Sequence, residues 1–215
     1  MQPGSNFSVS FYAKTTGISS VALRFTNPAT NAVLGTATVD VSSASSAWKQ
    51  FTAVVTIPAT SAPTVEAAFE LVAHSAGVIH LDAVSAFPGD AVGGLWRKDV
   101  FDMLKAMKPG FIRLPGGNYL EGTGMRTRWN WKATIGPREA RVGHYNTAWY
   151  YWVTDAVGLY ELLLLCEMLN TTPQLSVYTG YSMGRPYVAR KSPLATKNLL
   201  EVTDGLRRPP SSRPP

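Results

Sequence analysis

Residues 111–118 read Phe-Ile-Arg-Leu-Pro-Gly-Gly-Asn, and this stretch decides the fold of the second half of the chain. Its first four residues are nearly all apolar, which is typical of a short buried strand. The Pro-Gly-Gly that follows is a turn signal and ends the strand. A helical pattern precedes it over 92–108, with Leu95, Val100, Leu104 and Met107 on one face, and Lys108-Pro109-Gly110 ends that helix.

The residues after this stretch repeat the alternation of helix and strand. A long loop rich in Trp, Arg and Gly runs from Tyr119 to about Tyr151. A second helix, capped by Thr154 or Asp155, is predicted to run to about Leu169, and a second strand over 173–178. Strands that alternate with helices favour a parallel sheet or barrel. In a barrel, long loops after strands form the active-site face, so this loop is the candidate functional segment.

The first half of the chain has a different pattern. Short runs that alternate polar and apolar residues are separated by Ser, Thr, Gly, Asn and Pro, and such spacing indicates an antiparallel β-sandwich. Six strands are predicted, at 7–12, 21–25, 32–41, 48–57, 65–72 and 78–84. Because residue 7 already lies inside a strand, we expect earlier strands of the sandwich to be missing from the chain. Trp48 and Tyr12 either pack in the core and at the edge of this unit or form a platform for sugar rings.

Composition excludes several classes of protein. The 215 residues are 45% hydrophobic and 16% charged, which excludes a collagen, a coiled coil and a mainly disordered chain. No apolar run is long enough to span a bilayer, and the first residues lack the pattern of a signal peptide. A single cysteine, Cys166, leaves the redox compartment open. These residues leave the cellular compartment open between a secreted and a non-secreted protein.

Charge is unevenly spread and separates the two halves. Residues 1–87 carry three basic and four acidic side chains, whereas residues 88–215 carry seventeen and ten. Four of the six net positive charges fall in residues 190–215, without a recognition motif, so we expect no nucleic-acid partner. Membrane attachment has no support either. The predicted organisation is an incomplete β-sandwich over 1–87, an α/β segment over 88–200 and a low-complexity tail over 201–215.

Several motifs beyond residues 111–118 occur in a fixed order. They are Trp129-Asn-Trp-Lys132, Thr134-Ile-Gly-Pro137, Arg141-Val-Gly-His144 and Asp155-Ala-Val-Gly-Leu-Tyr-Glu161. Together they closely resemble the α-L-arabinofuranosidases of glycoside hydrolase family 51, over roughly residues 87–188. The resemblance implies that residues 88–200 are the amino-proximal part of a partial (β/α)8 TIM barrel. It also implies that residues 1–87 are an incomplete carbohydrate-binding-like domain, a jelly-roll-like antiparallel β-sandwich segment that precedes the barrel. It also implies an α/β catalytic part that hydrolyses terminal non-reducing α-L-arabinofuranosides in arabinose-containing polysaccharides or oligosaccharides.

The resemblance also implies two substrate-binding residues, Arg113 and Asn118, which contact the furanose in the family. Their chemistry suits that role. A guanidinium at a strand end can donate to sugar hydroxyls, and an amide offers both a donor and an acceptor. Gly116 and Gly117 permit a sharp turn and a close approach of the backbone to a ligand. The alternative for Arg113 is a structural salt bridge, and for the glycines a tight turn alone.

Other residues with possible chemistry favour structural roles. Glu121 is expected to pair with Arg126 or Arg128 rather than act as a general acid. Trp129 and Trp131 are expected to pack the long loop, with lining of the sugar site as the alternative. His144 is predicted to be a hydrogen-bonded loop histidine, Glu161 a buried or edge polar contact, and Cys166 a core residue. No second His or Cys lies at ligand spacing, so we expect no metal. We expect no organic cofactor either, because carboxylate chemistry alone suffices for the reaction that the resemblance implies.

The catalytic carboxylates are not found in this sequence. Retaining glycosidases need two of them about 5 Å apart. In the family the acid/base follows an asparagine, and this sequence contains no Asn-Glu dipeptide. Family character ends after about Tyr187, so we assign no catalytic residue and expect the 215-residue chain to be inactive alone. The alternative function is a fragment that binds plant polysaccharide without catalysis. The sequence does not indicate an oligomeric state.

Overall fold

A computed structural model describes residues 1–183 and divides the chain into two compact units, with the division between Met103 and Leu104. The described residues do not include the end of the predicted barrel segment, up to residue 200, or the predicted tail over 201–215. The fold class is a β-sandwich segment followed by a parallel βα segment, as the sequence indicated.

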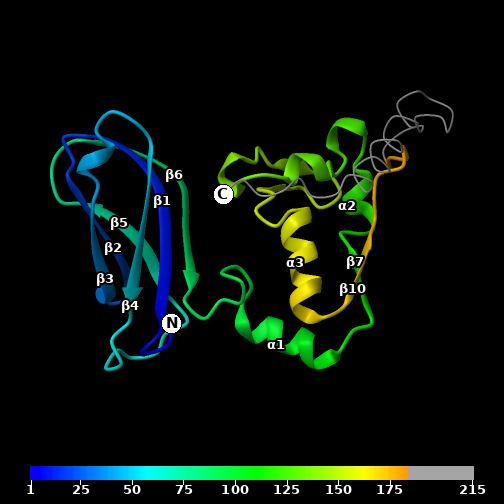
Figure 1. Cartoon of the computed structure of the whole chain (residues 1–215). Helices are drawn as coiled ribbons and strands as arrows, with labels where there is room; N and C mark the ends of the chain where they lie inside the picture. Colours follow the sequence, from blue (N-terminus) through cyan, green and yellow to red (C-terminus); the bar gives the residue numbers. More distant parts are fainter. Residues whose placement is uncertain (184–215) are drawn as a thin grey trace, which may run out of the picture. The chain divides into compact units, whose positions relative to one another are not determined.

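The first unit consists of two antiparallel sheets (Figure 1). Its strands are β1 (Asn6–Thr16), β2 (Ser20–Asn27), β3 (Ala32–Asp40), β4 (Lys49–Thr56), β5 (Ala68–Ala73) and β6 (Val78–Pro88). One sheet has the order β4-β1-β6 and the other β3-β2-β5, and a 3-10 turn at Ser42–Ala44 joins β3 to the segment before β4. All six predicted strands are confirmed, and β5 starts three residues later than predicted.

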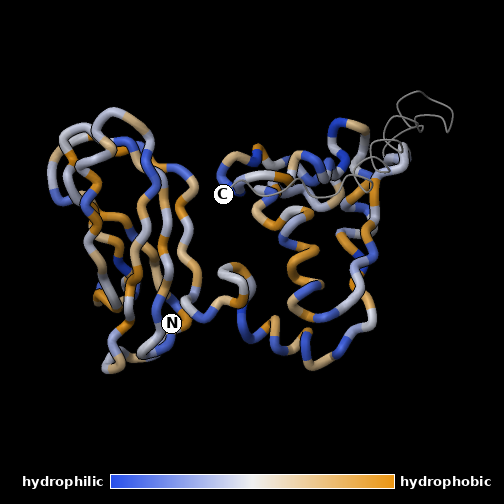
Figure 2. Tube along the Cα trace, in the orientation of Figure 1, coloured by the Kyte–Doolittle hydropathy of each residue, from blue (hydrophilic) through white to orange (hydrophobic). Residues whose placement is uncertain are grey.

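The core of the sandwich comes from the alternation within each strand, which Figure 2 shows as alternating hydropathy. On β1, Val9, Phe11 and Ala13 are at most 1% exposed, while the intervening Ser10 faces outward and bonds Ser85 on β6 at 2.9 Å between hydroxyl oxygens. Leu23 on β2 is fully buried in the same core. A period of two places alternate side chains on opposite faces, so each strand covers the core with one face only.

The second unit carries the predicted strand and the long loop. Helix α1 (Lys98–Met107) spans the division between the two units. The helices and strands that follow it in the second unit are β7 (Phe111–Leu114), α2 (Asn118–Glu121), β8 (His144–Asn146), β9 (Tyr151–Val153), α3 (Leu159–Leu169) and β10 (Thr172–Leu175). Three 3-10 turns lie in the loop, at Met125–Thr127, Trp131–Thr134 and Arg138–Ala140. Strands β7 and β10 pair in parallel, with Arg113 beside Gln174, and α3 packs on them (Figure 1). This is the βα alternation that the sequence predicted.

Helix α1 starts later than predicted and buries less. Residues 92–97 form a turn in which Gly93 and Gly94 have φ of 60° and 69°, a left-handed backbone that an α-helix excludes. The predicted apolar face is also wrong in part, because Val100 is 45% and Met107 is 73% exposed in the described structure. Phe101 is the buried residue of this helix.

Helix α3 also starts later than predicted, and neither Thr154 nor Asp155 caps it. Asp155 has φ of 56°, so the chain turns sharply there, and Gly158 is the residue that precedes the first helical turn. The helix ends as predicted at Leu169, where Asn170 adopts the left-handed conformation common at helix ends. Strand β10 covers only the first part of the predicted 173–178.

Candidate functional site

Arg113 and Asn118 lie at the two ends of one tight turn that follows β7. The Leu114–Pro115 bond is cis, and Gly116 and Gly117 have φ of 79° and 62°. Both Arg113 and Asn118 are exposed. Within residues 1–183 no hydrogen bond or ion pair reaches either side chain, so the salt bridge considered for Arg113 is not formed among the described residues. Their donors and acceptors are available to a ligand.

Gly116 fixes the position of the arginine head. A Cβ at this position would lie 3.0 Å from Cζ and 3.2 Å from Nε of Arg113, so the guanidinium rests on the glycine backbone. A side chain there would push the guanidinium away, and the positive φ would strain it further. The glycine therefore does more than permit the turn, because it also sets where the guanidinium lies.

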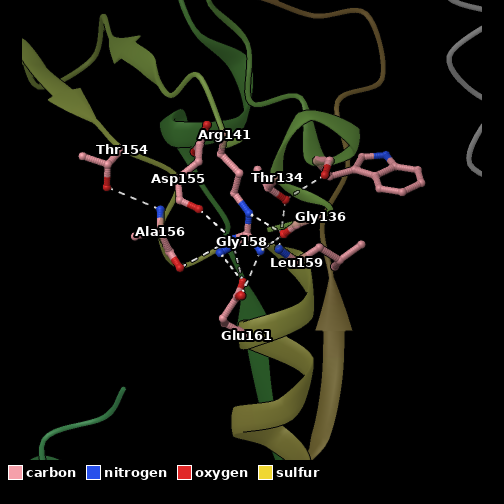
Figure 3. Close-up of polar contacts among 10 residues, drawn as sticks. Thr134, Gly136, Arg141, Thr154, Asp155, Ala156, Gly158, Leu159 and Glu161 are labelled. Atoms are coloured by element: carbon pink, nitrogen blue, oxygen red, sulfur yellow. Dashed lines mark hydrogen bonds and ion pairs between the residues drawn. The ribbon is translucent and has the colours of Figure 1, made fainter. Parts of the chain in front are cut away.

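The long loop is tied to α3 through a buried ion pair between Arg141 and Glu161 (Figure 3). Two parallel hydrogen bonds of 2.9 Å join the guanidinium to the carboxylate, and the two side chains are 3% and 9% exposed. The same guanidinium donates to the carbonyl oxygens of Gly136 at 2.8 Å and Asp155 at 2.8 Å. One arginine therefore joins the loop at Gly136 and the turn at Asp155 to the first turn of α3.

Glu161 is held in its charged form. Burial alone would raise the pKa of this carboxyl, but hydrogen bonds from Arg141 and from the backbone N–H of Gly158 outweigh it, so the pKa of Glu161 lies below its ordinary value. The contact with Gly158 satisfies one of the free donors at the helix start. This confirms the prediction that Glu161 makes a buried polar contact, and it removes Glu161 as a general acid.

Thr134 completes the start of α3 in place of the predicted caps. Its hydroxyl accepts from the N–H of Leu159 at 3.0 Å and donates to the carbonyl of Trp131 at 2.7 Å. A Cβ on Gly158 would lie 2.5 Å from the carbonyl oxygen of Thr134, so only glycine fits there. The loop thus supplies the helix cap from a residue 25 positions away, which local sequence rules could not indicate.

A second polar cluster lies beneath the turn that carries Asn118. His144 Nδ1 lies 3.1 Å from Asp155 Oδ2, and Asp155 is 4% exposed. The His144 ring contacts the Tyr119 ring, with centroids 5.5 Å apart. Burial and the nearby Asp155 carboxylate raise the pKa of Tyr119. His144 is hydrogen-bonded as predicted, although it lies on β8 rather than in a loop, and it supports the residue next to Asn118.

The remaining candidates have mostly structural surroundings. Trp129 is 2% exposed and lies 6.3 Å from the Tyr119 ring, which confirms the packing prediction for this residue. Trp131 is half-buried, with the Lys132 ammonium 5.5 Å from its ring centroid. Glu121 forms no ion pair with Arg126 or Arg128 in the described part of the chain, so that predicted pairing is wrong.

Arg128 is directed elsewhere because its guanidinium donates to the carbonyl of Met125 at 2.7 Å and lies 5.7 Å from the Tyr178 ring centroid. Cys166 is 1% exposed and is a core residue, as predicted.

In the first unit, Trp48 lies just before β4 and is 50% exposed, so it is outside the core. Its ring lies 6.5 Å from that of His80. Tyr12 projects from β1 on the outer face and is half-buried.

Within residues 1–183, no three His, Cys, Asp or Glu side chains lie together in an arrangement that could hold a metal ion. None of the helices in this part of the chain is long and apolar enough to cross a membrane.

Comparisons with known proteins find α-L-arabinofuranosidases. A family model described as the alpha-L-arabinofuranosidase 1 domain matches residues 103–204. A probable α-L-arabinofuranosidase A of Aspergillus terreus is 34% identical over 187 residues, covering 84% of this chain and 29% of the relative. Alpha-L-arabinofuranosidase 1 of Arabidopsis thaliana is 32% identical over 174 residues, covering 80% of this chain and 25% of the relative.

A solved structure extends the match to three dimensions. An arabinose-bound family 51 α-L-arabinofuranosidase superposes with a TM-score of 0.81 at 26% identity, over 92% of this chain and 33% of that one. Fold and family model together define a domain of the glycoside hydrolase class. More narrowly, the chain is a fragment similar to the α-L-arabinofuranosidases of glycoside hydrolase family 51. It spans between a quarter and a third of the length of these relatives.

Proposed function

We propose that the chain serves the hydrolysis of terminal non-reducing α-L-arabinofuranosyl groups in arabinose-containing polysaccharides or oligosaccharides. The observation that carries the proposal is the turn after β7, which leaves the Arg113 guanidinium and the Asn118 amide exposed at the end of a parallel strand. In α/β folds with parallel strands, ligands bind at that end of the strands. The relatives' names supply the sugar: they are α-L-arabinofuranosidases.

In this proposal Arg113 and Asn118 hold the furanose by hydrogen bonds to its hydroxyls. Gly116 sets the guanidinium in place, and the aromatic contacts of Tyr119 hold the turn that carries Asn118. Binding of this kind positions the glycosidic bond but does not cleave it, because cleavage needs a proton donor and a nucleophile.

The two buried carboxylates of the described residues are engaged in ion pairs and do not supply that pair. Glu161 is buried against Arg141, and Asp155 is buried against His144. A retaining mechanism needs two carboxyl groups that face one sugar about 5 Å apart. We therefore expect no turnover of an aryl α-L-arabinofuranoside by the 215-residue chain. Turnover that is abolished by Glu121→Gln or Glu161→Gln would overturn this assignment and relocate the catalytic pair.

Calorimetric titration with methyl α-L-arabinofuranoside tests the binding role. The 215-residue chain should bind this glycoside, and Arg113→Ala or Asn118→Ala should weaken binding about tenfold or more, since each removes hydrogen bonds to the sugar. Arg97→Ala is a matched control, because Arg97 is an exposed arginine paired with Asp99 in the turn before α1. Equal affinity of the Arg113 variant and the control would refute the proposed site.

A further inference from the structure

Asp155 is a buried carboxylate that takes no direct part in the proposed sugar site. It lies in the turn before α3 and is 4% exposed. Its φ of 56° falls in the left-handed region, which aspartate enters more readily than most residues but still at some cost. A buried charge also costs free energy. Features that oppose folding in this way cluster at functional sites, so the carboxylate calls for a role beyond packing.

The one hydrogen bond to the Asp155 carboxylate within residues 1–183 comes from His144. Nδ1 of His144 lies 3.1 Å from Asp155 Oδ2, whereas Oδ1 is buried and receives no hydrogen bond from the described residues. Because a carboxylate only accepts, the imidazole presents its N–H at Nδ1. Asp155 therefore fixes both the tautomer and the orientation of the ring, as carboxylates do for histidines in many enzyme sites.

The other ionisable groups near Asp155 do not replace His144. The Arg141 guanidinium donates to the backbone carbonyl of Asp155 at 2.8 Å, but its two parallel bonds go to Glu161. Burial, and after it the Asp155 carboxylate, raise the pKa of the Tyr119 phenol, so this neighbour stays neutral. The imidazole is therefore the group on which the position of the carboxylate depends.

The His144 ring carries this orientation to Tyr119. The imidazole meets the Tyr119 ring edge-on, with centroids 5.5 Å apart and an angle of 70° between the planes. The rings of Trp129 and Trp149 contact Tyr119 as well, at 6.3 and 6.4 Å between centroids. Among these three neighbours, His144 is the one that is oriented by a buried carboxylate.

Tyr119 in turn decides where Asn118 lies. Helix α2 (Asn118–Glu121) is a single turn, which is far too short to be stable by its own hydrogen bonds. Gly117 and Gly122 flank it with φ of 62° and 58°, so the backbone at both ends lacks the restraint of a Cβ. The turn is therefore held by tertiary contacts, and Tyr119, which follows Asn118 directly, supplies the aromatic ones.

We propose that Asp155 is a positioning residue of the sugar site, which acts through His144 and Tyr119 on the Asn118 amide. The carboxylate holds the imidazole, the imidazole edge holds the Tyr119 ring, and that ring holds the turn that presents Asn118 to a furanose hydroxyl. Binding is tighter when such a group is fixed before the ligand arrives. The inference rests on the proposed function, because it takes Asn118 to bind the sugar.

A measurement without sugar tests the first link. A two-bond nitrogen–proton spectrum of the imidazoles in the 215-residue chain at pH 8 should show His144 protonated at Nδ1. His74 and His80 are internal references, because both are exposed and neither contacts a carboxylate within residues 1–183. The tautomer of the unchanged chain needs no variant, so it remains decisive even where a variant does not fold.

Asp155→Gly tests the links to Asn118. Glycine tolerates the left-handed backbone, so this variant removes the carboxylate without adding strain. The His144 signals should move toward those of the reference histidines, and the amides of Asn118 and Tyr119 should shift. Thr154→Ala is the matched control, because it removes an exposed hydroxyl from the adjacent residue, where it accepts from the N–H of Ala156 at 3.4 Å. The control should leave all these signals in place.

Titration calorimetry with methyl α-L-arabinofuranoside tests the effect on sugar binding. Asp155→Gly should weaken binding about three- to tenfold, as expected when a hydrogen-bonding group is displaced. His144→Phe keeps a ring but has no donor for Asp155, so it should lose affinity to a similar extent. Asp155→Asn keeps an acceptor oxygen and tolerates the same backbone, so it should lose less than Asp155→Gly. Thr154→Ala should bind like the unchanged chain.

The outcomes separate this inference from the proposed function. If the unchanged chain does not bind the furanoside, the proposed function fails. If His144 of the unchanged chain is protonated at Nε2, the inference alone fails. Equal affinity of folded Asp155→Gly and Thr154→Ala also overturns the inference alone. So does tight binding by His144→Phe, because packing of a ring would then suffice without the carboxylate.

Discussion

Replacing Arg141 with methionine should destabilise the second unit more than any change at an exposed ion pair. The variant leaves the Glu161 carboxylate buried without its counter-ion, at a side chain that is 9% exposed. It also removes the donors to the carbonyl oxygens of Gly136, Asp155 and Ala156. Breaking a buried ion pair from one side costs about 3–5 kcal/mol. Because small domains have total stabilities of about 5–15 kcal/mol, this is a large share.

Urea unfolding followed by tryptophan fluorescence and circular dichroism measures the effect. At a slope of about 2 kcal/mol per molar urea, a loss of 4 kcal/mol lowers the midpoint of the second unit by roughly 2 M. The matched control is Arg97→Met, whose partner Asp99 is exposed, so this change should leave the urea midpoints close to those of the unchanged chain. Arg141→Lys keeps the charge but cannot form the two parallel bonds, so its loss should be intermediate.

A double variant distinguishes the ion pair from simple packing. Combining Arg141→Met with Glu161→Leu removes both charges, so the second unit should regain much of the stability lost in Arg141→Met alone. The reasoning fails if Arg141→Met costs no more than Arg97→Met. The reasoning also fails if the double variant loses as much stability as the two single variants together. In that case the unpaired buried carboxylate would not be the cause of the loss in Arg141→Met.

Three further results are expected. First, the pKa of Glu161 is lowered in the folded state, so the carboxylate stabilises the second unit fully above its ordinary pKa of 4.5, and this stabilisation is lost as the pH falls through the folded pKa. The urea concentration at the unfolding midpoint of the second unit should therefore decrease when the pH is lowered below about 5. In Glu161→Gln this decrease should be smaller. Second, burial raises the pKa of the Cys166 thiol, which is 1% exposed, so a thiol reagent at pH 8 should label it rapidly in urea and only slowly in the native chain. Third, Leu23→Ala leaves a cavity in the sandwich core and should cost about 2–5 kcal/mol in the first unit, with the urea midpoint of the second unit unchanged.

The sandwich could be predicted strand by strand because its signal is local. Alternation along residues such as Val9, Phe11 and Ala13 determines which face is buried, whichever strand becomes the neighbour. The pairing order of the sheets was not predicted, since it depends on contacts between distant strands. The sequence does contain a local indication that α1 starts late. Gly93-Gly94 disfavours a helix, although the predicted helix over 92–108 included these two residues.

The interior of the long loop could not be predicted in the same way. Glu161 on an otherwise apolar helix indicates that a buried carboxylate needs a partner, but nothing local indicates that the partner is Arg141 rather than Arg126 or Arg128. Likewise, the cap of α3 comes from Thr134, which is far away in sequence. The motifs in the loop indicated the family, while their structural roles became visible only in the folded chain.

The most direct test of the account is to locate the sugar on the chain by amide chemical shifts. In a two-dimensional nitrogen–proton spectrum of the 215-residue chain, methyl α-L-arabinofuranoside should shift the amides of residues 113–118 most strongly. Those shifts should disappear in Arg113→Ala. A spectrum that does not respond, or responds only within residues 6–88, would contradict the placement of the sugar site at the turn after β7.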